Sequence, residues 1–228
     1  MIADQDIERL TAEIRARRES VIQRVRELTT RPIEIVAVTK GHPVEVAVAA
    51  QRAGFDSLGE NYAQELVAKA ADFETLKLPQ PAWHFVGQLQ SNKIRSLAPY
   101  VSVWESLDRA SVLKELAKRS PGAVGYIQVD LAGVAGVAAS RGGCDRDEVE
   151  GLITQATQLG LDIRGLMGVG MPGEPEESRQ AFAWLSATAA RLQLPEVSMG
   201  MSADMDVAIE EGATELRIGT ALVGDRIG

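Results

Sequence analysis

The sequence has few of the residues that build cross-links and metal centres. Its 228 residues include one cysteine, Cys144, and two histidines, His42 and His84. One cysteine excludes an intramolecular disulfide and an all-cysteine metal site, and two histidines disfavour a histidine-rich metal centre. We therefore predict no metal site.

Long apolar runs and an excess of positive charge are also missing. No apolar run approaches the roughly 20 residues that span a bilayer, so we expect no membrane segment. The 24 basic and 32 acidic residues give a net charge of −8, which argues for a soluble protein and against broad nucleic-acid binding. The start of the chain is charged rather than signal-like, and the cytoplasm is the expected location.

The hydrophobic pattern predicts alternating strands and helices. Residues 4–30 repeat apolar side chains at helical spacing, which predicts a leading amphipathic helix. Short apolar strands are predicted at 33–40, 56–59, 83–87, 101–105, 124–131, 162–169, 196–200 and 214–218. Helices with one polar face are predicted at 43–53, 61–73, 91–98, 108–119, 145–159, 175–193 and 203–211.

This alternation favours one fold class. Eight strands that alternate with seven helices imply parallel pairing through right-handed crossovers. The length suits an α/β fold of the (β/α)8 TIM-barrel type better than an open sheet. No linker rich in proline, glycine or serine divides the chain, so we expect residues 1–228 to form a single domain with an extra N-terminal helix.

Lys40 closes the first predicted strand and stands before a turn marked by Gly41 and Pro43. A lysine in such a place is partly desolvated, which favours the neutral amine that attacks carbonyl groups. This is how a Schiff-base lysine is prepared. On this segment alone, a surface lysine at a strand end is the alternative interpretation.

Two small-residue loops follow the last two predicted strands. They are Ser-Met-Gly-Met-Ser at 198–202 and Arg-Ile-Gly-Thr-Ala at 217–221. TIM barrels often bind phosphate at this corner, where glycine admits the anion and hydroxyl groups donate hydrogen bonds. Helix capping by Ser202 and turn formation by Gly219 are the alternatives. Together with Lys40, the loops predict a site for an aldehyde that carries a phosphate.

At these residues the sequence resembles the pyridoxal-phosphate homeostasis family, single-domain relatives of the alanine racemase barrel. The stretches that match follow the family's order across nearly the whole chain. They are AVTK at 37–40, GENYAQE at 59–65, WHFVGQLQSNK at 83–93, RGLM at 164–167, SMGMS at 198–202 and RIGTAL at 217–222.

The resemblance implies a binding site for pyridoxal 5′-phosphate. Lys40 would hold the cofactor as an internal aldimine, and Ser202, Gly219 and Thr220 would hold its phosphate. Arg217 would face the pyridine nitrogen. Because a guanidinium is always charged and only donates hydrogen bonds, that nitrogen stays unprotonated, and the ring becomes a poorer electron sink.

Other roles are less constrained. Asn61, Met199 and Gly200 are expected near the cofactor ring. Instead of facing the ring, Arg217 could pair with a barrel acid such as Glu60 or Glu105. His84 could be a base or a hydrogen-bonded structural residue, and the structural role is favoured. Residues 90–93 border the pocket mouth or cap the following helix.

One region departs from the family pattern. Asp130 stands where the family usually has asparagine, and Arg141 stands where a lysine is expected. The apolar stretch 134–139 replaces a charged part of the same loop. The role of the loop at 130–143 is therefore open.

The resemblance favours a carrier over an enzyme. Alanine racemase uses a second acid/base, a tyrosine from an additional domain, and Tyr62, Tyr100 and Tyr126 fall at barrel positions instead. Efficient racemisation needs a proton donor on each face of the carbanion. We expect a monomeric protein of vitamin B6 homeostasis without catalytic residues, which could pass cofactor to apo forms of pyridoxal-phosphate enzymes. The alternatives are a pyridoxal-phosphate-dependent amino-acid racemase or lyase, and a cofactor-free Schiff-base aldolase.

Overall fold

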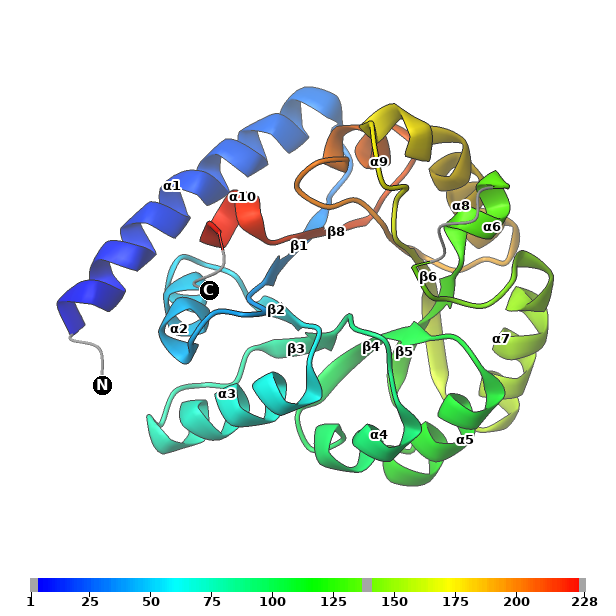
Figure 1. Ribbon diagram of the computed structural model, residues 1–228, viewed down its shortest axis with the longest axis horizontal. Coiled ribbons are helices and arrows are strands. Elements are labelled where there is room, and N and C mark those ends of the chain that lie inside the picture. Colours follow the sequence, from blue (N-terminus) through cyan, green and yellow to red (C-terminus); the bar gives the residue numbers. More distant parts are fainter. Residues whose placement is uncertain (1–3, 137–140, 226–228) are drawn as a thin grey trace.

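The computed structural model describes residues 4–136 and 141–225, and eight parallel strands close into a barrel in sequence order (Figure 1). The strands are β1 (Glu34–Val38), β2 (Ser57–Glu60), β3 (Ala82–Phe85), β4 (Val101–Leu107), β5 (Val124–Val129), β6 (Asp162–Gly168), β7 (Glu196–Ser198) and β8 (Glu215–Ile218). The predicted (β/α)8 fold is confirmed. That residues 1–228 form a single domain stays a prediction.

Helices form the outer ring of the barrel (Figure 1). They are α1 (Asp4–Leu28), α2 (Val44–Arg52), α3 (Ala63–Thr75), α4 (Ser91–Leu97), α5 (Ala110–Arg119), α6 (Leu131–Ala135), α7 (Val149–Gln158), α8 (Arg179–Arg191), α9 (Met205–Glu210) and α10 (Thr220–Val223). Two short 3₁₀ helices, η1 (Arg146–Glu148) and η2 (Pro175–Ser178), precede α7 and α8. The extra N-terminal helix, α1, packs on α2, α9 and α10.

The structure differs from the expected elements mainly at the carboxyl ends of the strands. The first strand stops at Val38 rather than residue 40, because Gly41 adopts a φ of +72° and turns the chain. The helices α6 and α10 were not expected from the sequence. Each has five or fewer residues, too few to show a helical hydrophobic period.

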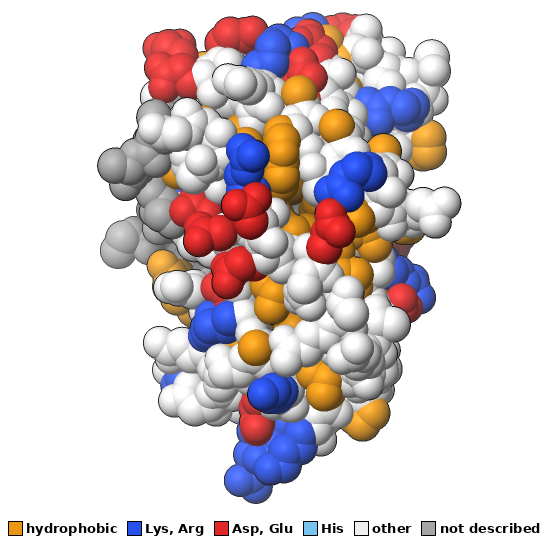
Figure 2. All heavy atoms as spheres, turned by 90° about the vertical axis from the view of Figure 1, so that its right-hand side faces the viewer, with side chains coloured by type: hydrophobic (Ala, Val, Ile, Leu, Met, Phe, Trp, Pro, Cys, Tyr) orange, Lys and Arg blue, Asp and Glu red, His pale blue; other side chains and the backbone are white. Residues whose placement is uncertain are grey.

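The hydrophobic core lies between the strands and the helices, and includes fully buried Leu58, Leu66, Phe73 and Trp83. On the face in Figure 2, acidic and basic side chains are interspersed with apolar ones. Arg191 and Glu150 form an exposed ion pair of 2.7 Å between α8 and α7. No helix in the described part of the chain is both long and apolar enough to cross a membrane.

Candidate functional site

A cavity of about 490 Å³ lies at the carboxyl ends of the strands. Six of the eight predicted site residues line it, namely Lys40, Asn61, Ser202, Arg217, Gly219 and Thr220. A larger cavity of about 620 Å³ lies between α1 and the starts of β1 and β2, and none of the predicted residues lines it. Barrel active sites form at the carboxyl ends, so we assign function to the smaller cavity.

Met199 and Gly200 do not line this cavity. Met199 is fully buried in the hydrophobic core. A Cβ on Gly200, whose φ is +93°, would lie 2.5 Å from Ala208 Cβ and 2.8 Å from Leu216 Cδ2. Gly200 therefore allows α9 to pack closely on β8. Contact of these two residues with a cofactor stays a prediction.

The loops after β7 and β8 are joined by Ser202. Its Oγ accepts a hydrogen bond of 3.2 Å from the backbone N–H of Ala221. A hydroxyl that accepts one bond keeps its own hydrogen to donate, so Ser202 can also donate into the cavity. Thr220 is the first residue of α10 and presents a second hydroxyl. The two loops thus offer hydroxyl donors to one anion.

Arg217 lies at the floor of the cavity and is only 4% exposed. Its Nη2 donates to the carbonyl oxygen of Gly168 at 2.7 Å, and its Nη1 donates to Ser198 Oγ at 2.5 Å. Ser198 Oγ donates in turn to Glu105 Oε2 at 2.7 Å, and Arg217 Nη1 is 3.7 Å from the same oxygen. The alternative ion pair with Glu105 is present, and Arg217 lines the cavity as well.

His84 does not line the cavity. It is 2% exposed, and its Nδ1 is 2.8 Å from Glu105 Oε1. Burial opposes charge on both groups, but their mutual hydrogen bond and attraction outweigh it, with Arg217 adding to the effect at Glu105. The pKa of His84 is therefore raised and the pKa of Glu105 is lowered. This geometry supports the favoured structural role of His84.

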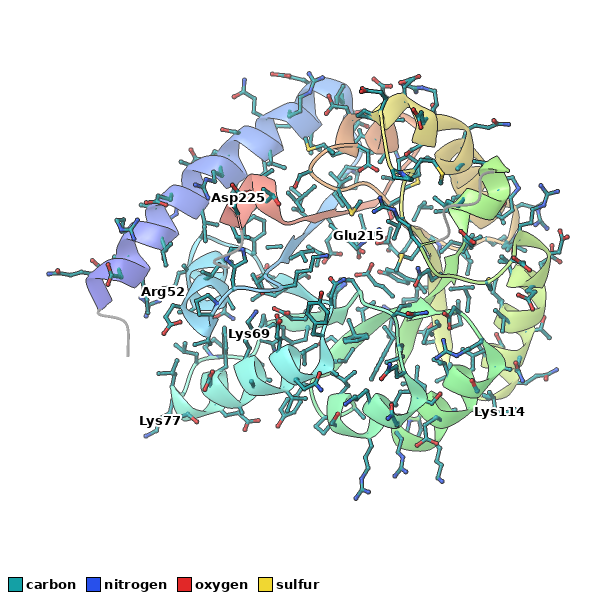
Figure 3. The ribbon with its side chains drawn as sticks, in the orientation of Figure 1. Arg52, Lys69, Lys77, Lys114, Glu215 and Asp225 are labelled. Carbon is teal, nitrogen blue, oxygen red and sulfur yellow. The ribbon has the colours of Figure 1, made fainter. Side chains whose placement is uncertain are left out.

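Glu215 adds a second buried carboxyl group inside the barrel (Figure 3). Tyr126 donates its hydroxyl to Glu215 Oε2 at 3.2 Å. Burial, together with the negative charge of Glu105, raises the pKa of Glu215 to about 8. At neutral pH this carboxyl group therefore retains its proton.

Ligand atoms of Glu34, His84 and Glu215 lie within 4.8 Å of one another, an arrangement that the sequence reasoning missed. All three have protein partners, since His84 bonds Glu105, Glu34 Oε1 accepts from Ser57 Oγ at 2.6 Å, and Glu215 Oε2 accepts from the hydroxyl of Tyr126. We therefore assign no metal to this group.

The structure adds cavity residues that the sequence reasoning did not choose. Gln128 and Arg141 line the cavity, and Gln128 Nε2 is 3.4 Å from the carbonyl oxygen of Arg141. The sequence feature that could have drawn attention to Arg141 is its departure from the family pattern, which has a lysine at this position. Asp130 caps α6 by accepting from the N–H of Ala132 at 3.1 Å. Residues 137–140 of the divergent loop lie outside the described residues.

Comparisons with known proteins identify the family of this chain. The family model for the alanine racemase N-terminal domain matches residues 16–227. A pyridoxal phosphate homeostasis protein of Pseudomonas aeruginosa is 37% identical over 198 residues, 85% of each chain. A protein of the same name from Vibrio alginolyticus is 36% identical over 231 residues, 97% of each chain.

Solved structures show the same likeness. PipY of Synechococcus elongatus, with pyridoxal phosphate bound, has a TM-score of 0.78 and 32% identity, covering 92% of this chain and 100% of that one. Alanine racemase from Corynebacterium glutamicum has a TM-score of 0.70 at 18% identity over 95% of this chain and 61% of that one, a likeness of fold. The chain therefore belongs to the pyridoxal phosphate homeostasis proteins, a family built on the alanine racemase N-terminal barrel.

Proposed function

We propose that this protein binds pyridoxal 5′-phosphate in the 490 Å³ cavity, with Lys40 as the covalent Schiff-base residue. One observation carries the proposal: the amine of Lys40 and the hydroxyl groups of Ser202 and Thr220 belong to the same cavity. They meet there because β1 pairs with β8, with Ala37 opposite Ile218. The phosphate lies against Ser202, Gly219 and Thr220.

The residues present fit such a ligand. The cavity volume falls in the range of about 300–1,000 Å³ that small-molecule sites occupy. Asn61 Oδ1 is buried without a hydrogen-bond partner in the described structure, which leaves it available to a polar group of the ligand. Arg217 supplies a permanent positive charge and only hydrogen-bond donors, so it keeps a facing pyridine nitrogen unprotonated. When bound, the cofactor supplies an aldehyde and an electron-withdrawing ring. Because Arg217 keeps the ring nitrogen unprotonated, the ring withdraws electrons less strongly.

A carrier role rests on what surrounds Lys40. Among the described residues that line the cavity there is no tyrosine, histidine, aspartate or glutamate. Tyr126, the buried tyrosine, bonds Glu215 instead. The described lining of the cavity thus offers no second acid/base of these types, which efficient racemisation requires. The function we propose is reversible holding of the cofactor in vitamin B6 homeostasis, without efficient catalysis.

Three further expectations accompany the proposal. The protein acts in the cytoplasm, a reducing compartment that suits the single, free and buried Cys144. It acts as a monomer. Its macromolecular partners are apo forms of pyridoxal-phosphate enzymes, which would receive the cofactor.

The test is the visible spectrum of the purified protein after incubation with pyridoxal 5′-phosphate, before and after borohydride, with the labelled peptide identified by mass spectrometry. We expect a yellow protein whose reduced adduct maps to Lys40. Lys40→Ala should lose the adduct, and Lys114→Ala, on exposed α5 surface, should keep it. A protein that takes up no cofactor refutes the proposal, and rapid turnover of free amino acids refutes the carrier role in favour of a racemase or lyase.

A further inference from the structure

The peptide units on both sides of Lys40 are fixed by side chains. Lys69 Nζ donates to the carbonyl oxygen of Thr39 at 2.8 Å. The backbone N–H of Gly41 donates to Glu65 Oε2, also at 2.8 Å. Backbone bonds also act on this turn, since the N–H of Thr39 donates to Gly59 O at 3.0 Å and the N–H of His42 donates to Thr39 O at 3.2 Å. The two side-chain bonds add to them on either side of Lys40.

Both holding residues lie on one face of α3. Glu65 and Lys69 are four residues apart, the spacing at which side chains meet on a helix, and Lys69 Nζ is 4.0 Å from Glu65 Oε2. Lys69 extends from α3 toward the barrel (Figure 3). Since α3 is anchored by fully buried Leu66 and Phe73, one packed helix holds the chain before and after Lys40.

The ammonium of Lys69 is in turn held by Glu60. Lys69 Nζ is 2.5 Å from Glu60 Oε1, which also accepts from Thr39 Oγ1 at 2.6 Å. Lys69 is 4% exposed and Glu60 is fully buried. A buried ion pair seldom stabilises a fold more than apolar side chains of the same volume. Its position next to Lys40 therefore points to a role beyond stability.

We propose that Glu65 and Lys69 are positioning residues that fix the backbone of Lys40 and thereby set the rate of cofactor release. The inference rests on the proposed function. In release, water adds across the C=N bond and returns the cofactor aldehyde and the free Lys40 amine. An amine on a fixed backbone stays within reach of the aldehyde and reforms the bond before the cofactor leaves. A loosened turn lets the cofactor escape more often.

The first test compares two substitutions at Glu65, whose side chain is 33% exposed, so the fold should tolerate both. Glu65→Gln keeps an acceptor oxygen for the N–H of Gly41, and Glu65→Ala removes it. The rate at which bound pyridoxal 5′-phosphate passes to a hydrazine in solution should rise about tenfold in Glu65→Ala, as expected for the loss of one charge-assisted hydrogen bond. It should rise less in Glu65→Gln, which keeps the bond but not the charge, and stay at the wild-type rate in Glu74→Ala, an exposed control on the same helix.

A test of Lys69 must not leave the buried carboxylate of Glu60 without its partner. Lys69→Met combined with Glu60→Gln removes both members of the ion pair. We expect faster cofactor release and a urea midpoint close to that of the wild type. A purely structural role for the pair predicts a lower midpoint with an unchanged release rate, and that result overturns the proposal for Lys69.

A second readout does not depend on the cofactor. Formaldehyde and borohydride methylate lysine amines, and mass spectrometry gives the labelling rate of Lys40 relative to Lys114. Glu65→Ala should speed up labelling of Lys40 and not of Lys114. Unchanged labelling and unchanged release overturn the inference. Faster labelling in a protein that takes up no pyridoxal 5′-phosphate supports the positioning of Lys40 and refutes only the proposed function.

Discussion

Arg217 Nη1 and Ser198 Oγ lie 2.5 Å apart, and this bond connects the cation at the cavity floor to a buried carboxylate. Ser198 donates onward to Glu105, which is fully buried. A buried charge without a partner is strongly destabilising. The guanidinium that would face the cofactor is therefore one half of a charge pair inside the barrel.

Removing the anion of this pair should destabilise the fold. In Glu105→Gln, the buried guanidinium of Arg217 loses its carboxylate and His84 loses its charged partner, and we expect the free energy of unfolding in urea to fall by about 3 kcal/mol. Glu115→Gln is the control, because the partner of Glu115 is the neighbouring Arg119 on the surface of α5. A similar, small change in both variants would show that the buried pair contributes little.

Loss of one cavity hydroxyl should weaken cofactor retention. Thr220→Val removes a donor while it keeps nearly the same size, and we expect the Kd for pyridoxal 5′-phosphate to rise about tenfold, as for a lost hydrogen bond to a charged group. Equilibrium dialysis measures this directly. Thr154→Val, on exposed α7 surface, should bind like the wild type. Equal affinity of the two variants would argue against a phosphate contact at Thr220.

Glu215 should make stability fall as the pH rises. Its pKa is about 8 in the folded protein against an ordinary value of 4.5, so between these values the folded state keeps a proton that the unfolded chain has released. The stability from this proton is present at acid pH and is lost as the pH rises toward 8. Glu215→Gln stays neutral throughout.

Urea unfolding of both proteins across this pH range tests the expectation. The stability of Glu215→Gln relative to the wild type should increase from about pH 5 to pH 8. His84 and Glu105 face the same carboxyl group and titrate together with it, so this difference reports the group as a whole. A constant difference would mean that Glu215 titrates normally.

Cys144 should react slowly in the folded protein. It is 3% exposed, and burial raises the pKa of its thiol to about 12, so little of the reactive thiolate forms at pH 8. We expect 5,5′-dithiobis(2-nitrobenzoate) to react at least about a hundredfold faster in urea than with the native protein. Comparable rates under both conditions would place the thiol at the surface.

The fold could be predicted because short strand-like segments with apolar residues alternate with helical segments along the chain. The position of Lys40, Ser202 and Thr220 at one cavity followed from the rule that strand ends meet at one end of a barrel. The rule does not say which side chains turn inward. Ser198 faces the barrel interior, and its neighbour Met199 lies in the outer core, because side chains alternate along a strand.

Sequence reasoning named Glu105 as a barrel acid that could pair with Arg217, but it did not find the group of acids around His84. Glu34, Glu105 and Glu215 stand on three different strands, β1, β4 and β8, and nothing in their sequence spacing indicates that they lie close together. They come together around His84 only through barrel closure. The position of Arg217 between this group and the cavity likewise depends on strand register.

The cavity forms only when the first strand pairs with the last. During synthesis, Lys40 emerges early, while Arg217 and Thr220 emerge among the last residues described. Until β8 closes against β1, the amine has no facing donors, and no pocket exists to protect an aldehyde. Cofactor uptake thus requires the last strand to be in place, and a protein that carries cofactor is one whose barrel has closed.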